Sequence, residues 1–224
     1  MEFKIKNGEK VLFIGDSITD CGRRGEFKPL GNGYVKLFSD MVISNFPNRK
    51  IEIINKGIGG NTILDLENRW EDDVIYQKPD WLIILIGIND LHRVLNKFEA
   101  WTEFTPENYR KRYDYILKRT TEKLNCKIIL IEPFYISTDT TDNFRGKVLK
   151  EIEEYIEIVE EMSKKYETYH LKIHRVFQEY LRYFEPETFA PEPVHPNSTG
   201  HFLIANQLFK MLGPYLEFIN EKGL

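Results

Sequence analysis

Cysteine is scarce in this chain of 224 residues. Cys21 and Cys126 are the only two, which is too few for a disulfide framework. We therefore expect free thiols and a reducing compartment. The first residues, Met1–Lys6, lack the apolar core of an export signal, so we expect a cytoplasmic protein.

Long apolar runs and an excess of positive charge are also missing. No apolar run approaches the ~20 residues that a membrane-spanning helix needs, so we expect no membrane partner. The 31 Lys and Arg residues are outnumbered by 35 Asp and Glu residues, which gives a net charge of −4. This balance argues against binding to nucleic acid.

The chain contains no internal repeat, low-complexity tract or linker, so we expect one domain over residues 1–224. Five apolar, β-rich runs alternate with segments of helical spacing. Such alternation predicts a parallel sheet that helices cover on both faces. The five runs are Val11–Ile14, Ile51–Ile54, Trp81–Ile86, Lys127–Ile131 and Tyr169–Ile173.

The first of these runs leads directly into a candidate nucleophile. Gly15 and Asp16 follow the strand, and Ser17 then stands where a helix would begin. Ligands of open α/β sheets bind outside the carboxyl ends of the strands, close to free N–H groups of helix starts. Ser17 could equally be an ordinary helix N-cap. A phosphate-binding loop is disfavoured because its lysine is missing. An aspartyl nucleophile at Asp16 is disfavoured because a second acidic residue is missing at position 18.

Further polar and aromatic residues follow the other strands. Asn55–Thr62 is rich in glycine and could offer free backbone N–H groups, although a plain tight turn explains it as well. Gly87–Asp90 places Asn89 at the same edge, where Asn-Asp is also a common turn. We expect Trp101, Phe134 and Tyr135 to line the mouth of the site and contact substrate.

A serine nucleophile needs a base, and the base needs an orienting group. Of five histidines, His195 is the favoured base because it lies in a proline-stiffened loop before a helix, three residues after Glu192. His92 is a second candidate. His170, His174 and His201 fit structural or surface roles better.

Four segments together resemble the SGNH hydrolases, also called GDSL-type esterases. The resemblance is carried, in the family's order, by Gly15–Ile18, Asn55–Thr62, Gly87–Asp90 and Glu192–Asn197. Within that family, the sequence around these segments is most similar to that of GDSL-type acetylxylan esterases. The resemblance implies a three-layer α/β/α, flavodoxin-like sandwich with a five-stranded parallel sheet.

The resemblance also implies roles. Ser17 would be the nucleophile, and His195 the general base and then the acid. The N–H groups of Ser17 and Gly60 and the amide of Asn89 would form the oxyanion hole. Asp16 could contact substrate, and no metal or cofactor is implied. One residue departs from the family pattern, because Glu192 stands where the family has aspartate. It could orient His195, or a backbone carbonyl could do so instead.

The implied function is removal of acetyl groups from small carbohydrates such as acetylated xylo-oligosaccharides. A lysophospholipase or short-chain carboxylesterase of the same family is the alternative, and a non-catalytic carbohydrate-binding module is the second. Assembly into a homo-oligomer is a further expectation for an esterase of this kind.

Overall fold

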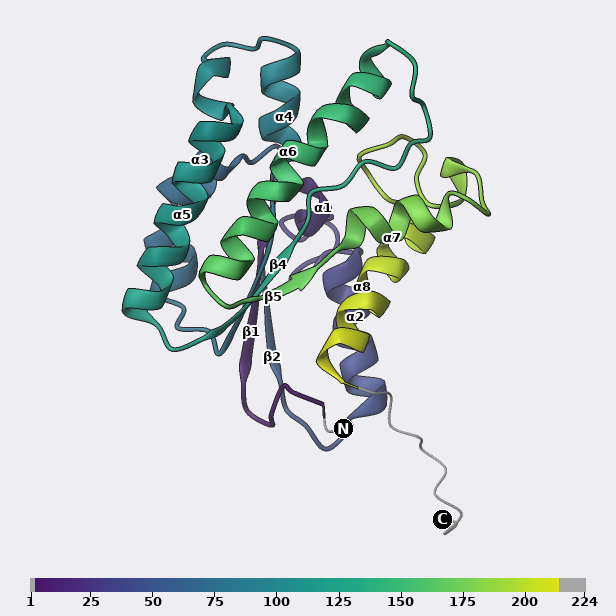
Figure 1. Cartoon of the computed structure of the whole chain (residues 1–224). Helices are drawn as coiled ribbons and strands as arrows, with labels where there is room; N and C mark the ends of the chain where they lie inside the picture. Colours follow the sequence, from purple (N-terminus) through teal and green to yellow (C-terminus); the bar gives the residue numbers. More distant parts are fainter. Residues whose placement is uncertain (1–2, 214–224) are drawn as a thin grey trace.

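The computed structural model describes residues 3–213, which form a five-stranded, wholly parallel sheet with helices on both faces (Figure 1). The strand order is β2-β1-β3-β4-β5. This confirms the expected α/β class, and the order is that of flavodoxin-like folds. The strands are β1 (Lys10–Gly15), β2 (Glu52–Gly57), β3 (Trp81–Leu85), β4 (Lys127–Ile131) and β5 (Tyr169–Leu171).

The longer helices form the two outer layers, and short helical segments lie among the connections. The helices are α1 (Ser17–Asp20), α2 (Tyr34–Asn45), α3 (Ile63–Asn68), α4 (Ile88–Leu95), α5 (Pro106–Lys123), α6 (Phe144–Lys165), α7 (Ile173–Tyr180) and α8 (Ser198–Leu212). Shorter segments are the π-helical η1 (Glu71–Ile75) and the 3₁₀ turns η2 (Trp101–Phe104) and η3 (Pro186–Thr188). Within residues 3–213, no helix is both long and apolar enough to cross a bilayer.

Aromatic packing joins the first strand to the layer that contains α2 and α8 (Figure 1). Phe13 of β1 lies between Tyr34 and Phe38 of α2, with ring centroids 5.8 and 5.6 Å away. Phe38 in turn meets Phe209 of α8 at 6.3 Å. All four rings are fully buried. This packing fixes the position of β1, whose carboxyl end leads to Ser17.

The strand β1 and its two neighbours, β2 and β3, end at the same level. Gly15, the last residue of β1, is paired with Gly57 of β2 and with Leu85 of β3. The chain passes from β1 to β2 on one side and then to β3 on the other. A topological switch point therefore lies between β1 and β3, and ligands of this fold bind there. Ser17 begins α1 after β1, and Asn89 lies in the first turn of α4 after β3, so the two residues flank this point.

Several element boundaries differ from the expected ones. The fifth strand ends at Leu171, because Ile173 already begins α7, and the helix expected over Gln178–Phe184 is wrong in its position. Gly87–Asp90 is not a plain turn but the start of α4. The helix expected from Thr62 onwards does begin there, with a Thr62–Asp65 capping box, but it breaks into α3 and the π-helical η1.

Candidate active site

Ser17, His195 and Glu192 form a continuous hydrogen-bonded chain. The Ser17 Oγ atom lies 2.9 Å from His195 Nε2. On the other side of the ring, His195 Nδ1 donates to Glu192 Oε1. This bond fixes the tautomer that leaves Nε2 free to accept the serine proton. The serine follows β1, and the other two residues lie in the loop before α8, where His195 is 178 positions away from Ser17.

Glu192 is fixed by the loop that carries it. Its Oε2 accepts the N–H of Val194 at 2.9 Å, and its Oε1 also accepts the N–H of His195 at 2.8 Å. Partial desolvation opposes ionisation, but these N–H groups and the His195 ring outweigh it and lower the pKa of Glu192. The residue is therefore ionised at neutral pH. The extra methylene of glutamate is accommodated, and a carboxylate oxygen orients His195.

Asp16, and not Ser17, caps helix α1. Asp16 Oδ1 accepts the N–H of Ile18 at 2.9 Å, and Ser17 is the first helical residue. The Ser17 N–H therefore has no acceptor within the helix and can meet a developing oxyanion. Asp16 itself is only 1% exposed, so the expected contact between Asp16 and substrate is wrong.

Gly60 and Asn89 lie together in the lining of one surface pocket. Gly60 has a φ of +78°, a left-handed conformation that favours glycine, and it is exposed. The Asn89 amide donates to the carbonyl of Asn61 at 3.0 Å, directly after Gly60. One amide hydrogen of Asn89 is therefore used to hold the glycine loop, and the second is available to a ligand.

The pocket beside Gly60 and Asn89 has a mostly apolar surface with several polar groups, and its volume is about 560 Å³. That size suits a small-molecule ligand. Its other lining residues are His92, Arg93, Asn96, Phe98 and Glu99.

The aromatic residues expected at the mouth do not all lie there. Phe134 has no exposed surface and packs on Phe177 with ring centroids 4.9 Å apart. Tyr135 is 3% exposed. Phe134 is therefore placed in the core and away from substrate. Tyr135 packs edge-on against His92 of the pocket, with ring centroids 6.2 Å apart, and its contact with substrate stays a prediction. Trp101 is 38% exposed in η2 but does not line the pocket of Gly60 and Asn89.

The other histidines are not part of the serine–histidine–glutamate chain. His201 is buried in α8, where its Nε2 lies 3.1 Å from the Cys21 Sγ atom, and burial lowers its pKa to about 4. Desolvation also lowers the pKa of His92, which lines the pocket. Burial raises the pKa of Cys21 to about 11, so its thiol is not an activated nucleophile.

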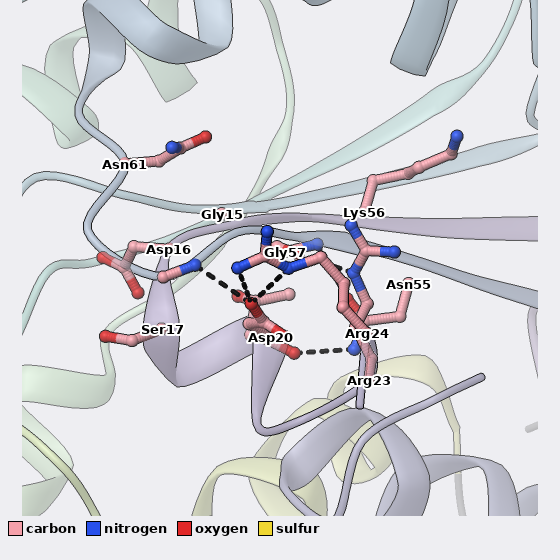
Figure 2. Close-up of polar contacts among 12 residues, drawn as sticks. Gly15, Asp16, Ser17, Asp20, Arg23, Arg24, Asn55, Lys56, Gly57 and Asn61 are labelled. Atoms are coloured by element: carbon pink, nitrogen blue, oxygen red, sulfur yellow. Dashed lines mark hydrogen bonds and ion pairs between the residues drawn. The ribbon is translucent and has the colours of Figure 1, made fainter. Parts of the chain in front are cut away.

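The glycine loop after β2 is held by residues that the sequence did not single out (Figure 2). Asp20 Oδ2 accepts the N–H of Gly59 at 3.0 Å. Arg23 donates to the carbonyl of Gly57 at 2.6 Å, and Arg69 donates to the Asn61 side chain at 2.9 Å. Among residues 3–213, no group of three or more His, Cys, Asp or Glu side chains is arranged to hold a metal ion.

Known proteins resemble this chain over nearly its whole length. A sequence model of the GDSL-like lipase/acylhydrolase family matches residues 13–203. The acetylxylan esterase of Geobacillus stearothermophilus is 38% identical over 220 residues, which cover 94% of this chain and 96% of that protein.

Solved structures agree with the sequence comparison. The crystal structure of that esterase, Axe2, has a TM-score of 0.87 at 35% identity and covers 96% of this chain and 100% of its own. LAE5, an α/β hydrolase enzyme from the metagenome of Lake Arreo in Spain, has a TM-score of 0.85 at 30% identity. It covers 94% of this chain and 98% of its own.

A parallel sheet with a serine, a histidine and a carboxylate joined at its carboxyl edge has the architecture of a serine hydrolase. This chain belongs to the GDSL-like lipase/acylhydrolase family. It is a carboxylic ester hydrolase related to acetylxylan esterases.

Proposed function

We propose that this protein removes acetyl groups from short acetylated carbohydrates, and in particular from acetylated xylo-oligosaccharides, with Ser17 as the nucleophile. The observation that carries this proposal is the chain from Ser17 Oγ through the His195 ring to Glu192. It supplies a nucleophile, a base and an orienting carboxylate in the geometry that acyl transfer needs.

The reaction would proceed in two steps. His195 Nε2 takes the proton of Ser17 as Oγ attacks the acetyl carbon, and the resulting oxyanion is stabilised by the Ser17 and Gly60 N–H groups and the Asn89 amide. His195 then gives the proton to the departing sugar hydroxyl, which leaves an acetyl-serine. Water, deprotonated by His195, attacks the acetyl carbon of this ester; the bond to Ser17 Oγ then breaks, His195 returns the proton to Oγ, and acetate is released.

The related esterase supports these roles. Variants of Axe2 described as catalytic mutants replace a serine, an aspartate or a histidine with alanine. The aspartate of Axe2 lies three residues before its histidine, which is the separation of Glu192 and His195 in this chain. Axe2 is also described as an acetyl-xylooligosaccharide esterase.

The surface of the pocket beside the oxyanion-hole residues is mostly apolar, but several of its lining residues offer polar groups that support a sugar ester. Of its lining residues, Arg93, Asn96 and Glu99 offer hydrogen-bonding groups, whereas Phe98 is the one large apolar side chain. Sugar hydroxyls match such groups, and the acyl-chain preference is decided by the experiment below.

The decisive experiment measures acetate release from acetylated xylo-oligosaccharides by the wild type and by Ser17→Ala, with an octanoyl ester as a second substrate. We expect release by the wild type only and poor octanoyl hydrolysis. If the octanoyl ester is preferred, a lysophospholipase or carboxylesterase of the same family replaces the sugar deacetylase. If Ser17→Ala matches the wild type in binding sugar and neither hydrolyses any ester, the protein is a carbohydrate-binding module.

A further inference from the structure

Helix α1 is only four residues long and has a functional group at each end. Ser17 is its first residue and Asp20 its last. The N–H of Asp20 bonds to the carbonyl of Asp16 at 2.8 Å, so the turn is closed. Any group fixed to Asp20 is therefore held at a constant position relative to the serine backbone.

Asp20 is fixed to the glycine loop after β2. Its Oδ2 atom accepts the N–H of Gly59 at 3.0 Å (Figure 2). A Cβ built on Gly59 would lie 3.8 Å from the Cβ of Ser17, so the loop passes directly beside the serine. The next residue is Gly60, whose N–H is the donor proposed for the oxyanion hole.

The same Asp20 oxygen is paired with Arg24. Arg24 Nε donates to Asp20 Oδ2 at 3.0 Å, and a second guanidinium nitrogen lies 2.9 Å away. The Asp20 side chain is 10% exposed, whereas that of Arg24 is 54% exposed. A carboxylate this close to a developing oxyanion would repel it, and the guanidinium compensates this charge from the solvent side.

Other bonds hold the loop as well: the Ile58 N–H donates to the Gly15 carbonyl at 3.1 Å, and Arg69 donates to the Asn61 side chain at 2.9 Å. Arg23 bonds to the carbonyl of Gly57, and Asn89 bonds to the carbonyl of Asn61. Both contacts are made through carbonyl groups. Asp20 bonds to an N–H group within the loop, at the residue before Gly60.

We propose that Asp20, paired with Arg24, is a positioning residue that sets the Gly60 N–H against the oxyanion formed on Ser17. Asp20 joins the helix that carries the nucleophile to the loop that carries the donor, and it touches neither substrate nor the reacting atoms. Its effect is therefore exerted in the transition state, where the donor matters, and not on binding of the neutral ester. This inference rests on the proposed role of Ser17.

The test compares Asp20→Ala, Asp20→Asn and Arg24→Ala with wild type on a small aryl acetate, which does not depend on recognition of a sugar. Asp40→Ala and Lys36→Ala are the controls, because Lys36 and Asp40 form another i,i+4 ion pair, at 2.6 Å in α2. A boronic acid, which forms a tetrahedral anion on a catalytic serine, is measured as an inhibitor of every variant. The melting temperature of each is also recorded.

We expect Asp20→Ala to lower kcat about 10- to 100-fold, part of what loss of a whole oxyanion donor costs, with KM changed less than about twofold. Boronic acid inhibition should weaken in parallel. Asp20→Asn keeps an oxygen for the Gly59 N–H and should recover part of kcat. Arg24→Ala should lower kcat at least about threefold. Because the Arg24 side chain is half-exposed, its removal leaves no buried cavity, so this variant decides the test if Asp20→Ala does not fold.

The proposal is overturned if both Asp20→Ala and Arg24→Ala stay within about twofold of wild type in kcat. It is also overturned if kcat falls while boronic acid inhibition is unchanged, since the oxyanion site would then be intact. Either result, beside a wild type whose activity is lost in Ser17→Ala, refutes the positioning role alone. Activity that survives Ser17→Ala refutes the proposed function.

Discussion

Replacement of Glu192 by glutamine tests how much His195 depends on a charged partner. In the triad of a serine protease, replacement of the carboxylate by an amide lowers kcat by about 10⁴, because the histidine then adopts the wrong tautomer. Here the Glu192 side chain is 44% exposed, so water already screens part of its effect on the imidazolium. We therefore expect a smaller loss for Glu192→Gln, of about 10²- to 10³-fold, or roughly 3 to 4 kcal/mol of transition-state stabilisation.

The assay is kcat and KM for a small acetyl ester between pH 5 and 9, with Glu187→Gln as the control. Glu187 is an exposed glutamate of the same segment, and its substitution should leave kcat unchanged. Glu192→Asp restores the residue usual in the family but shortens the side chain by one methylene. Because the loop accommodates glutamate through the N–H groups of Val194 and His195, we expect Glu192→Asp to lower kcat about tenfold.

A loss of less than about tenfold in Glu192→Gln, which is roughly 1.4 kcal/mol, would refute the reasoning. Glu192→Ala separates the two explanations for that outcome. If it also loses less than tenfold, Glu192 does not orient His195 during catalysis. If it loses much more, the oxygen of glutamine is enough and the charge contributes little.

Two further predictions concern stability, and both are measured by chemical denaturation. Desolvation raises the pKa of Asp16 from 3.8 to about 7, so the folded state holds a proton that the unfolded state has lost, and stability falls as the pH rises between these values. Asp16→Asn removes this cost, so its free energy of unfolding relative to that of wild type should increase by up to about 4 kcal/mol as the pH rises from 4 to 8. A difference in stability that does not depend on pH would refute this prediction. Gly57→Ala places a Cβ 2.3 Å from the backbone nitrogen of Asp20 and should lower the free energy of unfolding by about 1 to 3 kcal/mol. An unchanged unfolding midpoint would contradict this prediction.

The strands β1, β3 and β4 could be predicted because nearly all of their side chains are buried, on both faces of the sheet. Trp81–Leu85 is an unbroken apolar run and is fully buried as β3. The same rule fails at Ile173, which is fully buried but belongs to α7, because burial alone does not distinguish a strand from a helix. At Asp90 the residue type is misleading instead. An Asn-Asp pair is typical of a turn, but Asp90 is buried and lies in the first turn of α4. Asp90 is satisfied by the N–H of Ile63, 27 residues away, and no local pattern shows that contact.

Side-chain direction at the strand ends was the weakest part of the site prediction. Phe134 and Tyr135 do follow β4, as the alternation of strands and helices predicts, but packing against Phe177 turns the Phe134 ring inward. Asp20 was missed for a related reason. Its partner, Gly59, is 39 residues away, so the contact follows from the pairing of β1 with β2 and not from any spacing in the sequence.

The nucleophile and the base are held by different means, although they lie 2.9 Å apart. Ser17 stands at the end of a buried strand. The His195 loop has no regular structure and is fixed at its two ends. Before His195, the Pro193 carbonyl accepts the N–H of Ile136, and after it Asn197 caps α8 through the N–H groups of Thr199 and Gly200.

These two attachments join the His195 loop to the segment after β4 and to α8, which packs against α2 on the face that also fixes β1. The position of His195 is therefore fixed by the same core that fixes Ser17, but through a longer series of contacts. Disturbance of the core should misplace His195 before it misplaces Ser17, because each bond in that route adds its own freedom of movement. The activity of this enzyme should accordingly be lost at a lower denaturant concentration than its buried sheet.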